Sequence, residues 1–396
     1  MLSKRRRKMN RYVEIFLVAL RLGFTSFGGP VAHLGYFREE YINRRKWLDE
    51  KSYADLIALC QFLPGPASSQ VGISIGMVRG GILGGFLAWL GFTMPSVIAL
   101  IVFALVVTNV GGVDAGWIHG LKLVAVAVVT QAILGMGKKL TPDRERITIA
   151  IVGAVATLAF PTAWGQIGII LAAAIIGYIL YRNEEKEEMI VLPITFSKKL
   201  GIAAWVLFFG LLFSLPLLRN VFDSVAFAIF DIFYRVGSLV FGGGHVVLPM
   251  LERELVPAGF LSEESFLAGY GAAQGVPGPL FTLSGYIGAA IGSWPLALIA
   301  VAAIFLPSFL LLIGTLPFWN SIREMSFAQG ALKGVNAVVV GILLAALYDP
   351  VFTSAVQTPA DFAVVVIAFG LAQFWKVPAW LIVIGTAVAG AIISII

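Results

Sequence analysis

The two halves of this 396-residue chain carry the same short motifs in the same order. Phe27-Gly28-Gly29 in the first half recurs as Phe241-Gly242-Gly243 in the second. Pro64-Gly65-Pro66 recurs as Pro277-Gly278-Pro279 at nearly the same separation. Because order and spacing agree along most of each half, the sequence predicts an internal duplication, and the fold must accommodate two similar halves.

Single residues extend the match between the halves. The matched positions are Arg21 with Arg235, Gln61 with Gln274, Ser69 with Thr282, Gly72 with Gly285, Pro95-Ser96 with Pro307-Ser308, and Lys122 with Lys333. Several of these residues are polar or charged although they fall within or beside apolar runs, so they are the first candidates for a functional site.

Composition places this duplicated chain in a membrane. Hydrophobic residues make up 59% of the sequence and charged residues only 13%, and the mean hydropathy is +0.92. A soluble domain of this length could not bury so much apolar surface, whereas lipid is a suitable solvent for it. The 43 glycines agree with this class, since small residues favour close packing of membrane helices.

Apolar segments follow one another along the whole chain. They cover approximately residues 12–27, 54–78, 81–108, 117–138, 146–160, 163–181, 202–218, 224–241, 267–291, 295–317, 327–348, 361–374 and 378–396. Several are shorter than the roughly 20 residues that a spanning helix needs. We therefore predict an all-α polytopic membrane protein of about 13 transmembrane, broken or re-entrant helices, arranged in two repeats of inverted topology.

The repeats define three parts of the chain. Residues 1–181 form the first repeat, with six segments, and residues 224–396 form the second. Between them, 182–223 is a linker that begins with the polar run RNEEKEE and contains the helix 202–218, which has no partner in the other half. An odd extra crossing inverts the second repeat with respect to the first.

The charges of the loops support the inversion, with one exception. Loop 138–146 carries four basic residues, whereas its partner 349–360 carries no Lys or Arg, so the positive-inside rule puts the two on opposite sides. Loop 28–53 is expected outside and yet carries five basic residues. This loop is therefore also a candidate for an element that folds back into the membrane or lies at its surface.

The net charge of +6 comes from the N-terminal tail, which has six basic residues before the first apolar run. We read this tail as a cytoplasmic anchor of a multi-pass protein of the cell membrane. No basic face accompanies it, so a nucleic-acid partner is not expected. Cys60, the single cysteine, excludes an internal disulfide, and we expect neither a metal site nor a cofactor.

The glycine motifs are the first candidate anion-binding element. Gly28 and Gly29 match Gly242 and Gly243, and the second copy continues with Gly244 and His245. If a helix restarts after such a break, its free N–H groups and positive dipole end favour an anion. A tight turn or helix packing is the alternative. His245 has no counterpart, and His33 and His119 are weaker candidates.

The two proline motifs are the second candidate element. Each proline removes a backbone donor and interrupts the helix, which places such a break inside the protein or along a wet cavity. A hydroxyl follows each motif in the first turn of the next helix, and a glutamine precedes it. The candidate residues are Gln61, Pro64, Gly65, Ser69, Gln274, Pro277, Gly278 and Thr282. A plain kink is the competing interpretation.

Four basic residues complete the candidate site. Arg21 and Arg235 lie inside matching apolar segments, and Lys122 and Lys333 lie early in another matching pair. Related by a pseudo-twofold axis, they could surround a dianion, with Arg gripping two oxygens of a tetrahedral oxyanion. The alternative is that their side chains reach the membrane surface. No acidic residue is singled out as a proton carrier.

With these residues in view, the sequence resembles the chromate ion transporter family in its long, two-domain form. The resemblance rests on FTSFGGPVAHLGYF (24–37), LCQFLPGPASSQVGISIG (59–76), RVGSLVFGGGHVVLPMLERELV (235–256) and GYGAAQGVPGPLFTLSGYIGA (269–289). It implies export of chromate driven by the proton motive force, chromate resistance and an antiport mechanism at the inner membrane. It extends to sulfate, a dianion of similar shape.

The sequence leaves one other class of function open and argues against two more. An anion channel, or a transporter of a different inorganic anion, could use the same breaks. A membrane enzyme is not expected, because no catalytic cluster, phosphate loop or metal motif is present. A structural scaffold leaves the paired arginines without a purpose. The sequence leaves the oligomeric state open, including a homo-oligomer.

Overall fold

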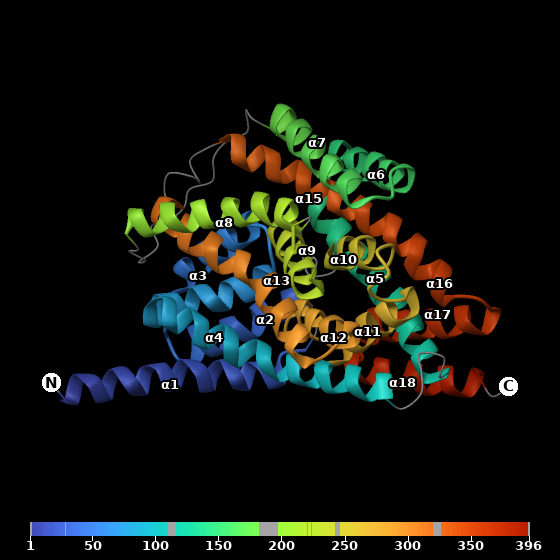
Figure 1. Ribbon diagram of the computed structural model, residues 1–396, viewed down its shortest axis with the longest axis horizontal. Helices are drawn as coiled ribbons and strands as arrows, with labels where there is room; N and C mark the ends of the chain where they lie inside the picture. The colour runs from blue at the N-terminus through green and yellow to red at the C-terminus, as the bar shows by residue number, and fades with distance from the viewer. Residues whose placement is uncertain are drawn as a thin grey trace.

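The computed structural model describes residues 2–27, 29–109, 116–181, 197–219, 221–222, 224–241, 246–319 and 326–394. Nearly all of these residues are helical, and none of those ranges contains a strand (Figure 1). The prediction of an all-α polytopic protein is confirmed. Five of the predicted site residues, Gly28, Gly242, Gly243, Gly244 and His245, lie outside the described ranges.

The first half contains eight described elements. They are α1 (Leu2–Thr25), α2 (Gly29–Phe37), the π-helical turn η1 (Arg38–Arg44), α3 (Glu50–Phe62), α4 (Ala67–Asn109), α5 (Gly116–Leu140), α6 (Arg144–Ala159) and α7 (Ala163–Tyr181). Asp49 caps the start of α3, where its side chain accepts a hydrogen bond from the Ser52 N–H.

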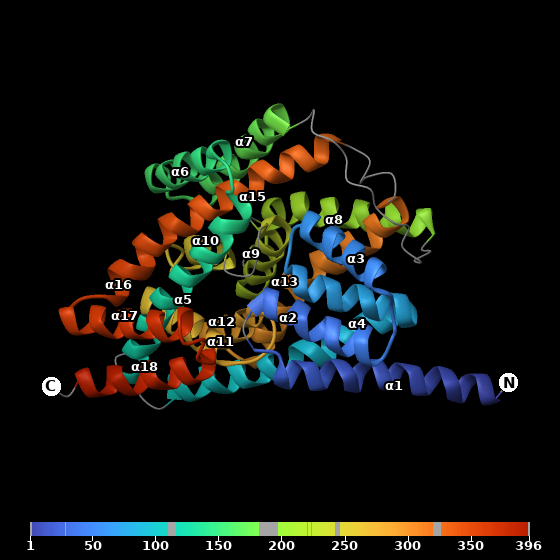
Figure 2. The same cartoon turned by 180° about the vertical axis from the view of Figure 1, so that it is seen from behind.

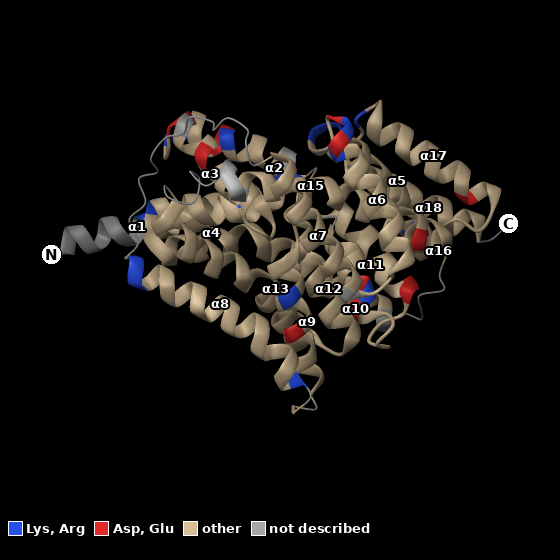
Figure 3. Cartoon of the chain, turned by 90° about the horizontal axis from the view of Figure 1, so that it is seen from above, with Lys and Arg blue, Asp and Glu red and all other residues tan. Residues whose placement is uncertain are grey.

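The second half repeats this order after the additional helix α8 (Lys198–Arg219). Its elements are α9 (Val225–Leu239), α10 (Val247–Leu255), α11 (Glu263–Gly275), η3 (Leu280–Thr282), α12 (Leu283–Ile291), α13 (Trp294–Thr315), η4 (Leu316–Phe318), α15 (Ser326–Ala346), η5 (Leu347–Phe352), α16 (Thr353–Ala355), α17 (Pro359–Gln373) and α18 (Ala379–Ile393). In Figure 3, α8 carries charge only near its two ends, as expected of a helix surrounded by lipid.

Helix α4 consists of two limbs rather than one long rod. Gly80 and Gly81 have non-helical dihedral angles, with φ of −138° and +66°. The chain reverses there. The two limbs lie so close that a Cβ atom on Gly76 would be 2.5 Å from the carbonyl oxygen of Gly84. The first limb is therefore 67–79 and the second is 82–109. In the second half, α12 and α13 correspond to these two limbs.

Two predicted segments need correction for the same reason. The segment 54–78 contains α3 and the first limb of α4, and the segment 267–291 contains α11, η3 and α12. In both cases the proline motif separates two helices, since proline provides no N–H and its ring blocks the preceding turn. The elements α2, η1 and α10 are helices where no apolar segment was predicted.

Five helices among the described residues are long and apolar enough to cross a bilayer. They are Ala67–Val107, Gly116–Leu140, Lys198–Arg219, Trp294–Phe318 and Gln329–Ala355. The first of these includes the bend of α4, so only its second limb is long enough to cross a bilayer. At 1.5 Å per residue that limb is about 42 Å long, whereas α3 and the first limb are each only about 20 Å long.

The elements around each break fold back on themselves. Arg45, which follows η1, lies with its Nη1 atom 3.0 Å from Glu14 Oε1 near the beginning of α1. Arg79, which ends the first limb of α4, lies 5.0 Å above the ring of Trp47, just before α3. The basic loop 28–53 therefore returns toward the N-terminal end of α1, which agrees with the fold-back interpretation of this loop.

The two halves pack against each other through the helices that follow α4 and α13. In Figures 1 and 2, α15 lies beside α6 and α7, and α5 lies against α17 and α18. Glycines allow this close contact: a Cβ atom would lie 2.0 Å from a carbonyl oxygen at Gly120 and at Gly341. His119 Nε2 lies 2.7 Å from Asp361 Oδ1 and joins α5 to α17.

Candidate functional site

The two proline motifs each contact the opposite half of the chain. The Gly65 N–H donates to the carbonyl of Val240 at 2.6 Å, and the Gly278 N–H donates to the carbonyl of Ser26 at 2.9 Å. Gly65 matches Gly278, and Ser26 matches Val240, each of which directly precedes a glycine motif. The two hydrogen bonds are therefore equivalent, and we call the place where these four residues meet the crossing.

The crossing needs glycine at its two donor positions. Gly65 has a φ of +118° and Gly278 a φ of +93°, conformations that side chains rarely adopt. A Cβ atom on Gly65 would lie 2.8 Å from Ser308 Oγ, and one on Gly278 would lie 3.0 Å from Ser96 Oγ. Since Ser96 and Ser308 are also matched, each proline motif packs against the equivalent serine of the other half.

Side-chain hydrogen bonds reinforce this exchange between the halves. Gln70 Nε2 donates to Pro64 O at 2.7 Å and lies 3.4 Å from Ser308 Oγ. On the other side, the Ser96 hydroxyl donates to the carbonyl of Pro277. Each of the two proline motifs is thus held by a polar side chain, which fixes the shape of the break.

Buried polar atoms without a hydrogen-bond partner gather around the crossing. Among the described residues, those on the segments that form the crossing are Ser26 Oγ, His33 Nε2, Ser69 Oγ, Gln70 Oε1, Thr93 Oγ1 and Gln274 Nε2. Buried polar groups are normally paired, and leaving one unpaired costs roughly 1–3 kcal/mol. Hydroxyls without a partner are suitable donors for a bound oxyanion.

His33 belongs to this polar group, although its sequence signal was weak. It is 1% exposed, its Nδ1 atom lies 3.2 Å from Ser68 Oγ, and its ring packs edge-on against Phe92. The duplication could not reveal it, because Val247 occupies its place in the second half. The clearest signal was local: His33 follows the glycine motif on the helix that restarts there.

Helices restart after the first glycine motif and after both proline motifs. α2 begins at Gly29, whose φ is +79°, α4 begins at Ala67 after Pro66, and η3 begins at Leu280 after Pro279. The first N–H groups of a helix have no partner within it and carry partial positive charge. The predicted hydroxyls differ: Ser69 is unpartnered among the described residues, whereas Thr282 donates to Pro279 O at 2.8 Å.

The two matched glutamines also differ. Gln274 is partly buried, and its Nε2 atom is among the unpartnered donors of the described residues. Gln61 is exposed at the end of α3. The prediction that both glutamines line one site is therefore supported by geometry only for Gln274, because α3 turns Gln61 outward while its neighbour Cys60 is fully buried.

The matched arginines bind carboxylates of their own half. Arg235 Nη2 lies 3.0 Å from Asp231 Oδ2, and Arg235 Nη1 lies 2.5 Å from Glu254 Oε1. Arg21 Nη1 lies 3.8 Å from Glu40 Oε2. Glu40 and Glu254 are matched positions, so in both halves an Arg–Glu pair joins the helices on either side of the glycine motif.

Arg21 lies inside an apolar segment of the sequence but is not buried in the structure. Its side chain is 59% exposed, because it lies on the outer face of α1 with Leu17 and Phe24, while Val18 and Leu22 face the core. Arg235 is buried, but two carboxylates compensate its charge. Neither arginine presents a free guanidinium to the crossing.

The two matched lysines lie near different groups from those that bind the arginines. Lys122 is 7% exposed on α5, and its charge acts on Glu263 at the beginning of α11. Lys333 Nζ lies 5.2 Å from the centre of the Tyr181 ring. Each of the four cations thus interacts with a different group. The structure does not bring them together around one dianion, contrary to the prediction.

Comparisons with known proteins agree with the motifs. The family model described as "Chromate transporter" matches residues 13–178 and 227–391, once in each half. A chromate transport protein of Pseudomonas aeruginosa is 27% identical over 376 residues, covering 92% of this chain and 88% of that protein. One of Cupriavidus metallidurans is 26% identical over 394 residues, covering 96% and 92%.

An uncharacterised transporter of Methanocaldococcus jannaschii is 26% identical over 338 residues, covering 84% of this chain and 83% of that protein. No solved structure matches the chain. The family model accounts for both halves, including the glycine and proline motifs that meet at the crossing. The chain therefore belongs to the chromate transporter family.

Proposed function

We propose that this protein is a secondary active transporter that exports chromate across the cytoplasmic membrane, coupled to the proton motive force, and that the anion binds at the crossing. The observation that carries the proposal is the reciprocal pair of hydrogen bonds from Gly65 and Gly278, surrounded by buried donors without partners. Breaks in matching places at a repeat interface are where secondary transporters bind their substrates.

The proposed architecture is an inverted repeat. Arg219 Nη1 lies 3.8 Å from Asp231 Oδ2, and the Tyr234 hydroxyl donates to Phe208 O, so α8 and α9 run antiparallel. This supports the proposal that α9 enters the membrane from the side opposite to that of its counterpart α1. The breaks of both halves then meet from opposite sides near the middle of the membrane.

The donors at the crossing suit a tetrahedral dianion. Chromate presents four oxygens that accept hydrogen bonds from hydroxyl, amide and backbone N–H groups together. The positive ends of the restarting helices offset part of its charge. Sulfate has the same charge and shape, so we propose that it competes for the same site.

The membrane potential adds to the driving force for export. Movement of a dianion out of a cytoplasm at −100 mV lowers its free energy by about 4.6 kcal/mol, since each charge contributes about 2.3 kcal/mol per 100 mV. Exchange for protons would add the energy of the pH gradient. The proposal therefore requires a flux that saturates with substrate and responds to both components of the gradient.

Uptake of labelled chromate into everted membrane vesicles tests the proposal. We expect saturable uptake that rises when the vesicles are energised, falls when either the pH gradient or the potential is removed, and is reduced by sulfate more than by chloride. An uptake rate that does not depend on the pH gradient would contradict proton coupling. Unitary currents in a planar bilayer would identify a channel instead.

A further inference from the structure

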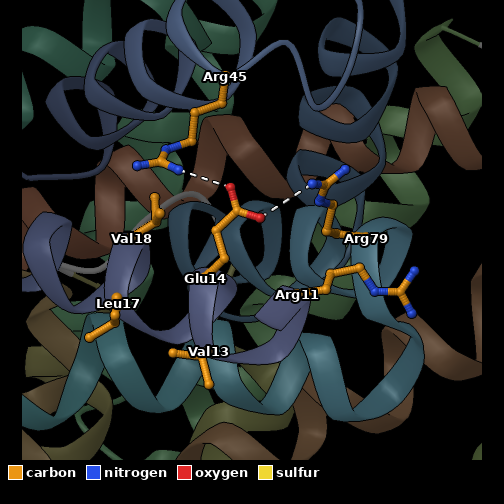
Figure 4. A pocket seen from close by; sticks show the side chains of 7 residues that line it. All are labelled: Arg11, Val13, Glu14, Leu17, Val18, Arg45 and Arg79. Carbon is orange, nitrogen blue, oxygen red and sulfur yellow. Dashed lines mark hydrogen bonds and ion pairs between the residues drawn. The ribbon is translucent and has the colours of Figure 1, made fainter. Parts of the chain in front are cut away.

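A pocket that the transport proposal does not use lies between α1, the end of η1 and the bend of α4. Its volume is about 620 Å³. Figure 4 shows the Glu14 carboxylate between the guanidinium groups of Arg45 and Arg79, with Arg11 on the same wall. Since α1 begins with the sequence of the basic tail, the pocket lies at that end of the molecule.

The pocket has more positive than negative charge. Glu14 lies 3.0 Å from Arg45 Nη1 and 3.3 Å from Arg79 Nη2, so one carboxylate is shared by two arginines. The guanidinium of Arg11 points away from Glu14 (Figure 4), and no ion pair of the described residues includes it. Two positive charges of the lining residues therefore remain uncompensated within the pocket.

Neighbouring carboxylates do not remove this excess. Glu40 accepts from Arg45 Nε at 2.7 Å, but it is shared with Arg21 and Arg44. The Nε atoms of Arg11 and Arg79 are buried and have no hydrogen-bond partner among the described residues. These donors are suited to an anion with several oxygens, such as a phosphate group.

The other wall of the pocket is apolar and opens to the outside of the helix bundle. Val13 and Leu17 line it and are 50% and 54% exposed. They continue along the outer face of α1 to Phe24, which is 61% exposed. Figures 1 and 2 show α1 at the edge of the molecule. A ligand that satisfies both walls has an anionic head and an apolar tail.

We propose that this pocket binds the phosphate group of an anionic phospholipid, with an acyl chain along Val13 and Leu17. Basic pockets between membrane helices on the cytoplasmic side recognise such head groups, and each arginine near the surface contributes severalfold to the affinity. A free phosphate ion would satisfy the arginines but would leave the exposed apolar wall without a partner.

Titration of the full-length purified protein in neutral detergent tests the proposal. The probes are short-chain phosphatidylglycerol, short-chain phosphatidylcholine and inorganic phosphate, and binding is followed by native mass spectrometry. We expect phosphatidylglycerol to bind about tenfold or more tightly than either of the others. Equal binding of the two lipids, or equally tight binding of inorganic phosphate, would overturn the assignment.

Three variants connect the binding to this pocket. Arg11→Gln removes a cation without leaving a carboxylate unpaired, and it should weaken phosphatidylglycerol binding about fivefold. The exposed Arg144 lies outside the pocket, so Arg144→Gln should leave binding unchanged. Glu14→Gln should tighten phosphatidylglycerol binding, whereas misfolding would weaken it.

Unchanged binding in Arg11→Gln, or weaker binding in Glu14→Gln, would refute the assignment of the lipid site to this pocket. The measurement needs no chromate, so it is independent of the transport proposal.

Discussion

At the crossing, the backbone of Gly65 has a φ of +118° and no space for a Cβ atom beside Gln70 and Ser308. Gly65→Ala should therefore destabilise the protein by about 1–3 kcal/mol from the backbone alone, with a further cost from the clash. The midpoint of thermal unfolding in detergent measures this loss. Gly210 on α8 has no atom within 4 Å of a Cβ position, so Gly210→Ala should not lower the midpoint. Equal midpoints for the two variants would contradict the geometry of the crossing.

Arg235 is expected to hold the hairpin around the second glycine motif rather than the substrate. Arg235→Gln removes the cation that binds Glu254 and leaves Asp231, which is 0% exposed, with Arg219 at 3.8 Å. Breaking such a buried pair costs about 3–5 kcal/mol. We expect less protein in the membrane, with an unchanged KM for chromate in the protein that remains. Arg235→Gln combined with Glu254→Gln restores the native net charge and should recover part of the loss. A raised KM at a normal protein level would return Arg235 to the substrate site.

The sequence predicted some residues of the crossing and missed others for a physical reason. Gly65, Gly278, Ser69 and Gln274 were found because they are matched or lie beside matched motifs. Thr93 was not proposed and His33 was only a weaker candidate, because their positions at the crossing depend on which helices pack against each other. The arginines were overvalued because Glu40 and Glu254, which neutralise them, lie far from them along the chain.

Among the elements, the hairpin of α1, α2 and η1 predicts on which side of the membrane its exposed residues lie. Since Arg45 returns to Glu14, the exposed residue Glu39 should lie at the membrane surface on the side of the N-terminus. Cys60 is the single cysteine and is buried, so a Cys60→Ser protein with Glu39→Cys carries one accessible thiol. A membrane-impermeant maleimide should label it in everted vesicles and not in intact cells. The reverse pattern would show that this segment crosses the membrane.

Hydropathy predicted the long helices well and the short ones poorly. The expected segments 117–138 and 295–317 correspond to α5 and α13 within two residues at each end. α2 and α10 were missed because each has only nine residues and carries or adjoins charged positions. Short helices of this kind depend on tertiary packing rather than on their own apolar length.

For the whole molecule, the inversion of the second half remains a prediction. Glu264 near the start of α11 is exposed and matches a position near the start of α3, on the Glu39 side of the first half. In the Cys60→Ser protein, Glu264→Cys should be labelled from outside intact cells, opposite to Glu39→Cys. Labelling of both positions from the same side would contradict the inverted arrangement. The sequence could predict this arrangement only from the additional helix 202–218 and the loop charges, because no local pattern reports on orientation.

Binding of chromate to the Ser69→Ala protein tests most directly whether the crossing is the anion site. The Ser69 hydroxyl is buried and has no partner among the described residues, so its removal should not reduce the stability of the free protein. We predict that the Kd for chromate, measured by calorimetry on purified protein, rises about tenfold or more, the effect of losing a hydrogen bond to a charged ligand. Ser284→Ala is the matched control, because that buried hydroxyl already donates to Phe281 O at 2.7 Å, and its Kd should not change. A Ser69→Ala protein that binds chromate as tightly as the native chain would place the anion elsewhere.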